Sequence, residues 1–407
     1  MYDGVVIGGG PAGMFAAIVA AQNGARVLLL EKNDRLGKKL LITGKGRCNV
    51  TNDCTAQEVL QNVPRNGRFL YSAMENFPPS QIMEFLERHG CPLKVERGNR
   101  VFPVSDQSVT VLNALKNELR SSGVTVRTGV VKGICVADGC VSGVELQNEK
   151  ISCSWVILAT GGVSYPATGS TGDGYKMAES LGHTIIAPIG SLVPLESDDA
   201  FCKMMQGLSL RNVAVRLTNE KGKSVFKDFG ELLFTHFGIS GPTVLSASAH
   251  LPKGICSLHI DLKPALDEGK LNDRLLRDLE QYKNRTMENA LTDLLPRSMI
   301  PVVLMRLGIP ADLPAHSLKK EQRRKLLALL KDFTVNISGR RPVAEAIITS
   351  GGVKTSEIDP RTMESKIVGG LHFAGEIIDC DAYTGGFNLQ IAWATAYAAA
   401  MAVKNHH

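Results

Sequence analysis

Short apolar runs, each closed by glycines or by a polar residue, stand near both ends of the chain. Residues 5–7 form one such run, followed by three glycines, an alanine-rich stretch over 11–22 and a second apolar run over 27–30 that ends at Glu31. Continuous apolar runs of this length are typical of strands buried on both faces. The order therefore predicts a β-α-β unit in a parallel sheet with a right-handed crossover.

The pattern after this unit is mixed. Residues 32–52 show little apolar periodicity and predict a long functional loop. Helical periodicity follows near 80–90 and 106–122. Three short alternating runs near 124–128, 130–137 and 140–147 predict a small antiparallel layer, and 155–159 reads as another buried strand.

The pattern of apolar and polar residues changes near residue 190. Near residue 346 it again resembles the pattern at the start of the chain. The intervening segment, 191–345, predicts an insertion with a β part (about 191–262 and 332–345) and a helical part (about 266–331). The expected fold class is α/β: a Rossmann-like domain with a parallel sheet, formed by 1–190 and 346–407, interrupted by a β-rich plus helical domain.

Composition and charge argue against a nucleic-acid-binding, disulfide-rich or membrane-spanning protein. The 407 residues carry a net charge of +6, which suits an anionic ligand but is weak evidence for nucleic acid, and the basic run over 319–325 is interpreted as a solvated helix face. The nine cysteines are odd in number and contain no CxxC pair, which favours reduced thiols and a cytoplasmic location. We expect no metal site, and no apolar run is long enough to span a membrane.

Gly8-x-Gly10-x-x-Gly13 lies between the first strand and the first helix, with Glu31 at the end of the next strand. Gly8 permits a tight turn, Gly10 admits a pyrophosphate close to the backbone, and Gly13 allows helix and strand to pack closely. Glu31 is placed to accept hydrogen bonds from ribose hydroxyls. This spacing predicts dinucleotide binding by Gly8, Gly10, Pro11, Ala12, Gly13, Glu31 and Lys32.

Three further segments have small or polar residues suited to a flavin. They are the loop 44–52, the strand end 159–162, and Gly375-Glu376 followed by a glycine turn and a helix over 385–390. A helix N-terminus beside the ring would stabilise negative charge on a reduced flavin. The expected contacts are Gly46, Arg47, Cys48, Asn49, Asn52, Val131, Ala159, Thr160, Gly161, Gly375, Glu376, Gly386, Asn388, Leu389 and Gln390.

The stretches 42–52, 161–174, 235–242 and 385–390 together resemble the YhiN-type (BaiN-like) flavoprotein family of the glutathione reductase-like superfamily. The resemblance runs over essentially the whole chain, and Ala382 departs from the glycine common at that position. It implies FAD as the cofactor and an inserted domain that covers the flavin. Members of the family include enzymes resembling aminoacetone oxidase and a reductase proposed in bile acid dehydroxylation.

We therefore expect an FAD-dependent oxidoreductase, in the first instance an oxidase or dehydrogenase of a small, amine-like molecule that gives hydride to flavin N5. The alternatives are an NAD(P)H-dependent reductase of an unsaturated or steroid-like substrate, with NAD(P)H bound transiently, and an RNA-associated flavoprotein. A redox-silent FAD-binding protein is a fourth. The expected partners are a small-molecule substrate and no stable nucleic acid or membrane, in a monomer or homodimer.

Two side chains are candidates for catalysis. His236 lies in a glycine-flanked turn of the insertion, where a near-neutral pKa would suit an acid or base, and Cys48 lies in the expected flavin loop. Each also has a purely structural interpretation, since a lone histidine commonly bonds a turn backbone and a free cysteine is usually just buried.

Overall fold

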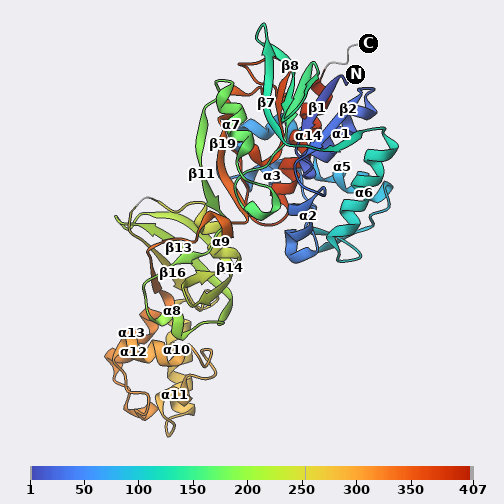
Figure 1. Cartoon of the computed structure of the whole chain (residues 1–407). Coiled ribbons are helices and arrows are strands. Elements are labelled where there is room, and N and C mark those ends of the chain that lie inside the picture. The colour runs from blue at the N-terminus through green and yellow to red at the C-terminus, as the bar shows by residue number, and fades with distance from the viewer. Residues whose placement is uncertain (1, 253, 404–407) are drawn as a thin grey trace. The chain divides into compact units, whose positions relative to one another are not determined.

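The computed structural model describes residues 2–252 and 254–403, which divide into two compact units (Figure 1). Unit 1 comprises Met1–Ser191 and Val343–His407, and unit 2 comprises Leu192–Pro342. Each unit has its own hydrophobic core. The α/β fold class predicted from the sequence is confirmed.

Unit 1 is built on a five-stranded parallel sheet in the order β20-β10-β1-β2-β6. Its strands are β1 (Gly4–Ile7), β2 (Val27–Glu31), β6 (Thr125–Thr128), β10 (Trp155–Leu158) and β20 (Leu371–Phe373). The three central strands β1, β2 and β10 consist wholly of buried residues, which explains their unbroken apolar runs. The sequence placed 124–128 in the antiparallel layer, and this was wrong because β6 pairs in parallel with β2.

Smaller sheets and helices surround this sheet. The antiparallel layer contains only β7 (Val131–Ala137), β8 (Cys140–Leu146) and β9 (Lys150–Ser152), and β3 (Thr51–Asn52), β5 (Arg100–Pro103) and β4 (Leu93–Glu96) form another. The helices of unit 1 are α1 (Pro11–Gln22), α2 (Lys38–Ile42), α3 (Ala56–Gln61), α4 (Tyr71–Asn76), α5 (Pro79–Arg88), α6 (Ser108–Ser121), α7 (Asp173–Ser180) and α14 (Phe387–Ala402). The predicted loop over 32–52 therefore contains a short helix, α2. Short 3₁₀ turns lie at Thr43–Gly46, Gly67–Leu70, Pro166–Thr168, Val343–Glu345, Thr355–Glu357 and Gly375–Ile377.

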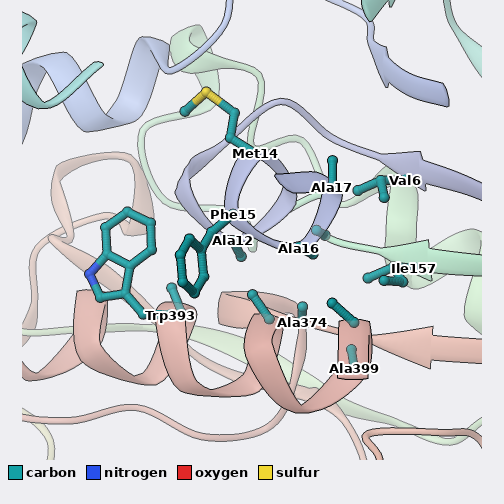
Figure 2. Close-up of a cluster of buried hydrophobic side chains, with 14 of the residues drawn as sticks. Val6, Ala12, Met14, Phe15, Ala16, Ala17, Ile157, Ala374, Trp393 and Ala399 are labelled. Atoms are coloured by element: carbon teal, nitrogen blue, oxygen red, sulfur yellow. The ribbon is translucent and has the colours of Figure 1, made fainter. Parts of the chain in front are cut away.

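The alanine-rich helices α1 and α14 pack against each other at the centre of unit 1 (Figure 2). Small side chains such as Ala12 and Ala16 allow the close approach, and the rings of Phe15 and Trp393 meet edge to face with centroids 5.7 Å apart. The indole of Trp393 donates a hydrogen bond to the Val50 carbonyl (2.9 Å). This packing fixes the N-termini of both helices, which face the site described below.

Unit 2 contains a seven-stranded sheet in the order β17-β16-β13-β14-β15-β12-β18. Its strands are β12 (Leu195–Glu196), β13 (Ser209–Asn219), β14 (Ser224–Thr235), β15 (Gly238–Ser240), β16 (Cys256–Asp261), β17 (Phe333–Ile337) and β18 (Gly339–Arg340). Its helices are α8 (Phe201–Met204), α9 (Pro242–Ser248), α10 (Glu268–Gln281), α11 (Met287–Ala290), α12 (Ile300–Leu307) and α13 (Lys320–Lys331), with a 3₁₀ turn at Ala315–Ser317.

The chain leaves unit 1 along β11 (Ile185–Ser191) and returns along β19 (Ile348–Val353), and these two strands pair antiparallel. No helix within the described residues has both the length and the apolarity needed to cross a bilayer.

Candidate cofactor site

A pocket lies in unit 1 at the carboxyl ends of four parallel strands, where α/β sheets usually bind their ligands. Its walls come from the segments that directly follow β1, β2, β10 and β20. The predicted contacts that line it are Gly8, Gly10, Pro11, Ala12, Glu31, Lys32, Val131, Ala159, Thr160, Gly161, Gly375, Glu376, Asn388 and Leu389. Residues from distant parts of the chain are thus brought into one cavity.

The glycine turn after β1 has the geometry that the fingerprint predicts. Gly8 has a φ of +108°, and a Cβ there would lie 2.4 Å from the Ala159 carbonyl oxygen. A Cβ on Gly13 would lie 1.8 Å from the Gly8 oxygen, so Gly13 is needed for helix–strand packing. A Cβ on Gly10 would meet no protein atom within 4 Å. The turn is therefore open only at Gly10, where room for a pyrophosphate is expected.

Glu31 is held at the adenosine end of the expected site by backbone and side-chain bonds. Its Oε2 accepts the Gly9 N–H (2.6 Å), and its Oε1 accepts both the backbone N–H (2.8 Å) and the side-chain amide (2.6 Å) of Asn33. The carboxylate is fixed while still lining the pocket. This position suits a carboxylate that accepts hydrogen bonds from the hydroxyl groups of a ribose.

Lys32 pairs with Asp173 at the start of α7 (Nζ to Oδ2, 2.5 Å) and also donates to Thr171. The lysine lowers the pKa of the Asp173 carboxyl, chiefly through this hydrogen bond. Both residues line the pocket, so this wall is a neutral ion pair.

A polar network closes another part of the pocket around Glu376. Its carboxylate accepts hydrogen bonds from Lys39 Nζ (2.5 Å), Ser164 Oγ (2.8 Å) and the Thr349 N–H (2.8 Å). Nearby, the Thr160 hydroxyl is buried and has no hydrogen-bond partner within the described residues, although Thr160 lines the pocket. An orphaned buried hydroxyl is unfavourable unless a ligand or water satisfies it.

The N-terminus of α14 supplies the last wall. Gly386 precedes the helix with a φ of +98°, and no side chain caps the first turn. The Asn388 side chain instead bonds both the N–H (2.8 Å) and the carbonyl (2.7 Å) of Ala382, which fixes the shape of the preceding loop. The partial positive charge of this uncapped end is available to a negatively charged ring.

The remaining predicted contacts lie outside the pocket lining: Gly13, Gly46, Arg47, Cys48, Asn49, Asn52, Gly386 and Gln390. Arg47 pairs with Glu96 and Asp106, and Gln390 is wholly buried, bonding Thr51 and the Phe77 carbonyl. Asn52 bonds the carbonyls of Gly98 and Gly385. These side chains hold the loops in place, and their contact with FAD stays a prediction.

Sequence reasoning also missed residues that line the pocket. They include Asn33, Gly37, Lys38, Lys39, Leu40, Thr43, Val130, Thr168, Gly169, Ser170, Asp173, Met177, Ile347, Ile348 and Ala392. Most of them lie in segments without a motif, and only the tertiary structure brings them together. Among them, Asp173 is the first residue of α7 and places an acidic side chain in the first turn of that helix.

The catalytic candidates have contrasting environments. His236 is exposed in unit 2, where its ring contacts Phe237 edge to face at 5.0 Å. Cys48 is fully buried in unit 1, and burial raises the pKa of its thiol to about 12. A thiol with so high a pKa is neutral at physiological pH and a poor nucleophile. Both catalytic roles stay predictions.

The environment of Cys48 predicts slow alkylation. With iodoacetamide at neutral pH, we expect the exposed Cys140 to be modified in the native protein while Cys48 is protected until denaturant is added. Peptide mass spectrometry would measure both sites in one sample. Modification of Cys48 and Cys140 at similar rates in the native protein would contradict the buried, protonated assignment.

The pocket fits FAD in its donor set. The open Gly10 position and the uncapped α1 suit a pyrophosphate, Glu31 suits a ribose, and the orphaned Thr160 hydroxyl and the uncapped α14 suit a polar ring.

A model of the HI0933-like protein Rossmann domain matches residues 2–402. The chain belongs to this family. It is 34% identical to a 3-dehydro-bile acid delta(4,6)-reductase of Clostridium scindens, covering 98% of both chains. It is 32% identical to a ribosomal RNA dihydrouridine synthase of Escherichia coli, covering 98% of this chain and 97% of the other.

The fold is similar to that of 3-ketosteroid delta1-dehydrogenase from Sterolibacterium denitrificans, with a TM-score of 0.50 and 14% identity, over 98% of each chain. The predicted YhiN-type (BaiN-like) kinship is confirmed by the family match and these relatives. So is the prediction of an FAD-dependent oxidoreductase.

Proposed function

We propose that this protein reduces a carbon–carbon double bond conjugated to a carbonyl group. The observation that carries the proposal is the chemistry shared by two relatives that match over nearly the whole chain. A 3-dehydro delta(4,6) bile acid has double bonds in conjugation with its ketone. Dihydrouridine is uridine whose double bond, conjugated to a ring carbonyl, has been saturated. A common reaction therefore underlies two unlike substrates.

The net reaction consumes one NAD(P)H and one proton and yields NAD(P)⁺ and the saturated carbonyl compound. When bound, FAD supplies the hydride that the double bond receives, and NAD(P)H renews it. The chain's own groups bind and orient: the Gly8–Ala12 turn and α1 hold phosphates, Glu31 holds ribose, and the uncapped α14 stabilises negative charge. The sequence contains one dinucleotide fingerprint, which is assigned to FAD, so the proposal has NAD(P)H bind transiently and not in a second nucleotide-binding domain.

An anaerobic visible spectrum of the purified holoprotein tests the proposal. We expect the flavin bands to bleach on addition of NADH or NADPH, and to return when a conjugated enone is added. A saturated ketone of the same skeleton is the matched control and should leave the bands bleached. Bands that persist with both nucleotides would contradict the proposal and favour oxidation of a donor substrate, for which small amines would be tested first.

Uridine in RNA is the substrate that the charge distribution favours. Unit 2 carries 23 lysines and arginines against 17 aspartates and glutamates, so it holds the whole excess of +6, and unit 1 is balanced. A small enone makes no use of a charged domain, whereas a polyanion is attracted by it. The sequence alone predicts no stable nucleic-acid partner, because its basic excess is interpreted as spread along the chain, with only one modest basic run over 319–325.

A further inference from the structure

A row of basic side chains crosses the seven-stranded sheet of unit 2. Arg216 of β13 lies directly opposite Lys227 of β14 on one side and opposite His259 of β16 on the other. Directly opposed residues in antiparallel strands are about 5 Å apart, and like charges so placed repel each other. Among the described residues, no carboxylate lies within ion-pair distance of Arg216 or Lys227. His259 contacts the Asp332 carboxylate (Nδ1 to Oδ1, 2.7 Å), so the two cations of this row without a counter-ion among the described residues are Arg216 and Lys227.

The row lies on the face of the sheet that points away from the core. Val213, Val215 and Leu217 of β13 are buried, and the alternate residue Arg216 is only partly so. Two residues along β14 from Lys227, and therefore on the same face, Phe229 is 58% exposed. Exposing a phenylalanine ring to water is energetically unfavourable. A ring beside cations is suited to stacking on the aromatic bases of a nucleic acid.

This face ends in a crevice of about 910 Å³. Phe229 and Arg211 line it, and its floor is formed by buried apolar residues such as Leu262 and Met299. Strand β13 has a bulge between Leu210 and Val213, so Arg211 and Asn212 are not paired with β14, and Asn212 has a φ of +64°. Bulges of this kind re-aim side chains next to binding sites.

Lys263 lines the same crevice as an uncompensated cation. Burial lowers the pKa of its ammonium, and Arg274 lowers it further. Asp261, two residues away, is already paired with Lys331 (2.5 Å). Within the part of the chain that the structure describes, no carboxylate lies within ion-pair distance of Lys263. A partly buried ammonium whose influential neighbour is another cation favours an anionic ligand.

We propose that this basic face, comprising Arg211, Arg216, Lys227, Phe229 and Lys263, binds a single-stranded segment of RNA. The cations contact phosphates and Phe229 stacks on a base at the crevice. A small amphipathic acid would occupy the crevice and leave the row of Arg216 and Lys227 without a function. An acidic peptide would leave Phe229 unexplained. The inference rests on the proposed function, since it provides the face that holds an RNA substrate.

The test is direct binding of a fluorescein-labelled, single-stranded oligouridine to the full FAD-loaded protein, followed by fluorescence anisotropy. We expect Arg216→Glu with Lys227→Glu to weaken binding about tenfold or more and to flatten its salt dependence between roughly 50 and 200 mM. Phe229→Ala should weaken binding about fivefold or more at all salt concentrations. Arg216→Gln with Lys227→Gln, a milder pair, serves if the charge reversals do not fold.

The matched control is Lys320→Glu with Arg324→Glu on α13, which makes the same change of charge at exposed residues of the same unit. It should retain most of the affinity. Equal weakening by the two pairs, or no binding by the wild type, would overturn the proposal. So would cholate binding at the crevice without competition by oligouridine. Binding is measured without turnover, so oligouridine that binds but does not restore bleached flavin bands would refute the reaction on uridine and leave the basic face intact.

Discussion

A Gly10→Val variant is expected to fold normally and to lose its FAD. In the protein alone, a Cβ at Gly10 meets no atom within 4 Å, and the backbone there has an ordinary φ of −78°. The added side chain would therefore occupy only the space assigned to the pyrophosphate. Loss of hydrogen bonds to a charged group costs about 3 kcal/mol, or roughly a hundredfold in affinity. Flavin titration and thermal unfolding of the apoprotein would measure the two effects separately.

Gly13→Val is the matched comparison. Its Cβ would lie 1.8 Å from the Gly8 carbonyl oxygen, so the helix and strand must separate even without cofactor. We expect this apoprotein to be strongly destabilised or insoluble, whereas the Gly10 variant melts like wild type. Wild-type affinity for FAD in Gly10→Val would show that the phosphates do not lie against this turn.

Glu376→Ala is expected to destabilise the protein by about 3 kcal/mol, because it leaves a partly buried cation without its counter-ion. Lys39, Ser164 and the Thr349 N–H all donate to this carboxylate, and the Lys39 side chain is only 20% exposed. For a unit of this size the loss corresponds to a fall of roughly 6–12 °C in Tm. Differential scanning calorimetry of the holoprotein would measure it.

Two further variants serve as controls for the loss of stability expected in Glu376→Ala. Glu376→Gln retains an oxygen acceptor for Ser164 and Thr349 and should lose less than half as much. Glu75→Ala removes an exposed acid from α4 and should melt within about 1 °C of wild type. If Glu376→Ala had the same Tm as Glu75→Ala, the hydrogen-bond network around Glu376 would not contribute measurably to the stability of the protein.

The dinucleotide turn could be predicted because its determinants lie within one β-α-β unit. Gly8, Gly10, Gly13 and Glu31 follow one another at spacings that local geometry dictates, and the structure gives each glycine a distinct steric environment. The wall around Glu376 could not be predicted in the same way. Lys39, Ser164 and Thr349 belong to segments far apart in sequence, and no local pattern relates them.

The loop over 44–52 could not be assigned from its sequence with the same precision. Its glycines and polar residues predict cofactor contact, which stays a prediction, and the structure shows Arg47 bonded to Glu96 and Asp106 and Cys48 in the core. A polar side chain satisfied by a carboxylate and one satisfied by a ligand have the same sequence signature. Only the positions of the partners, which are set by β4 and β5, distinguish them.

The pairing of β11 with β19 has a consequence for inheritance. Gly190 lies opposite Thr349, and Ser191 lies opposite Ile348. The two points at which unit 2 is inserted into unit 1 are therefore next to each other in a pair of hydrogen-bonded strands. A gene segment encoding the intervening 151 residues can be exchanged by recombination without separating these two points. A single recombination event can thus replace the whole of unit 2, while every residue that lines the pocket of unit 1 is inherited unchanged.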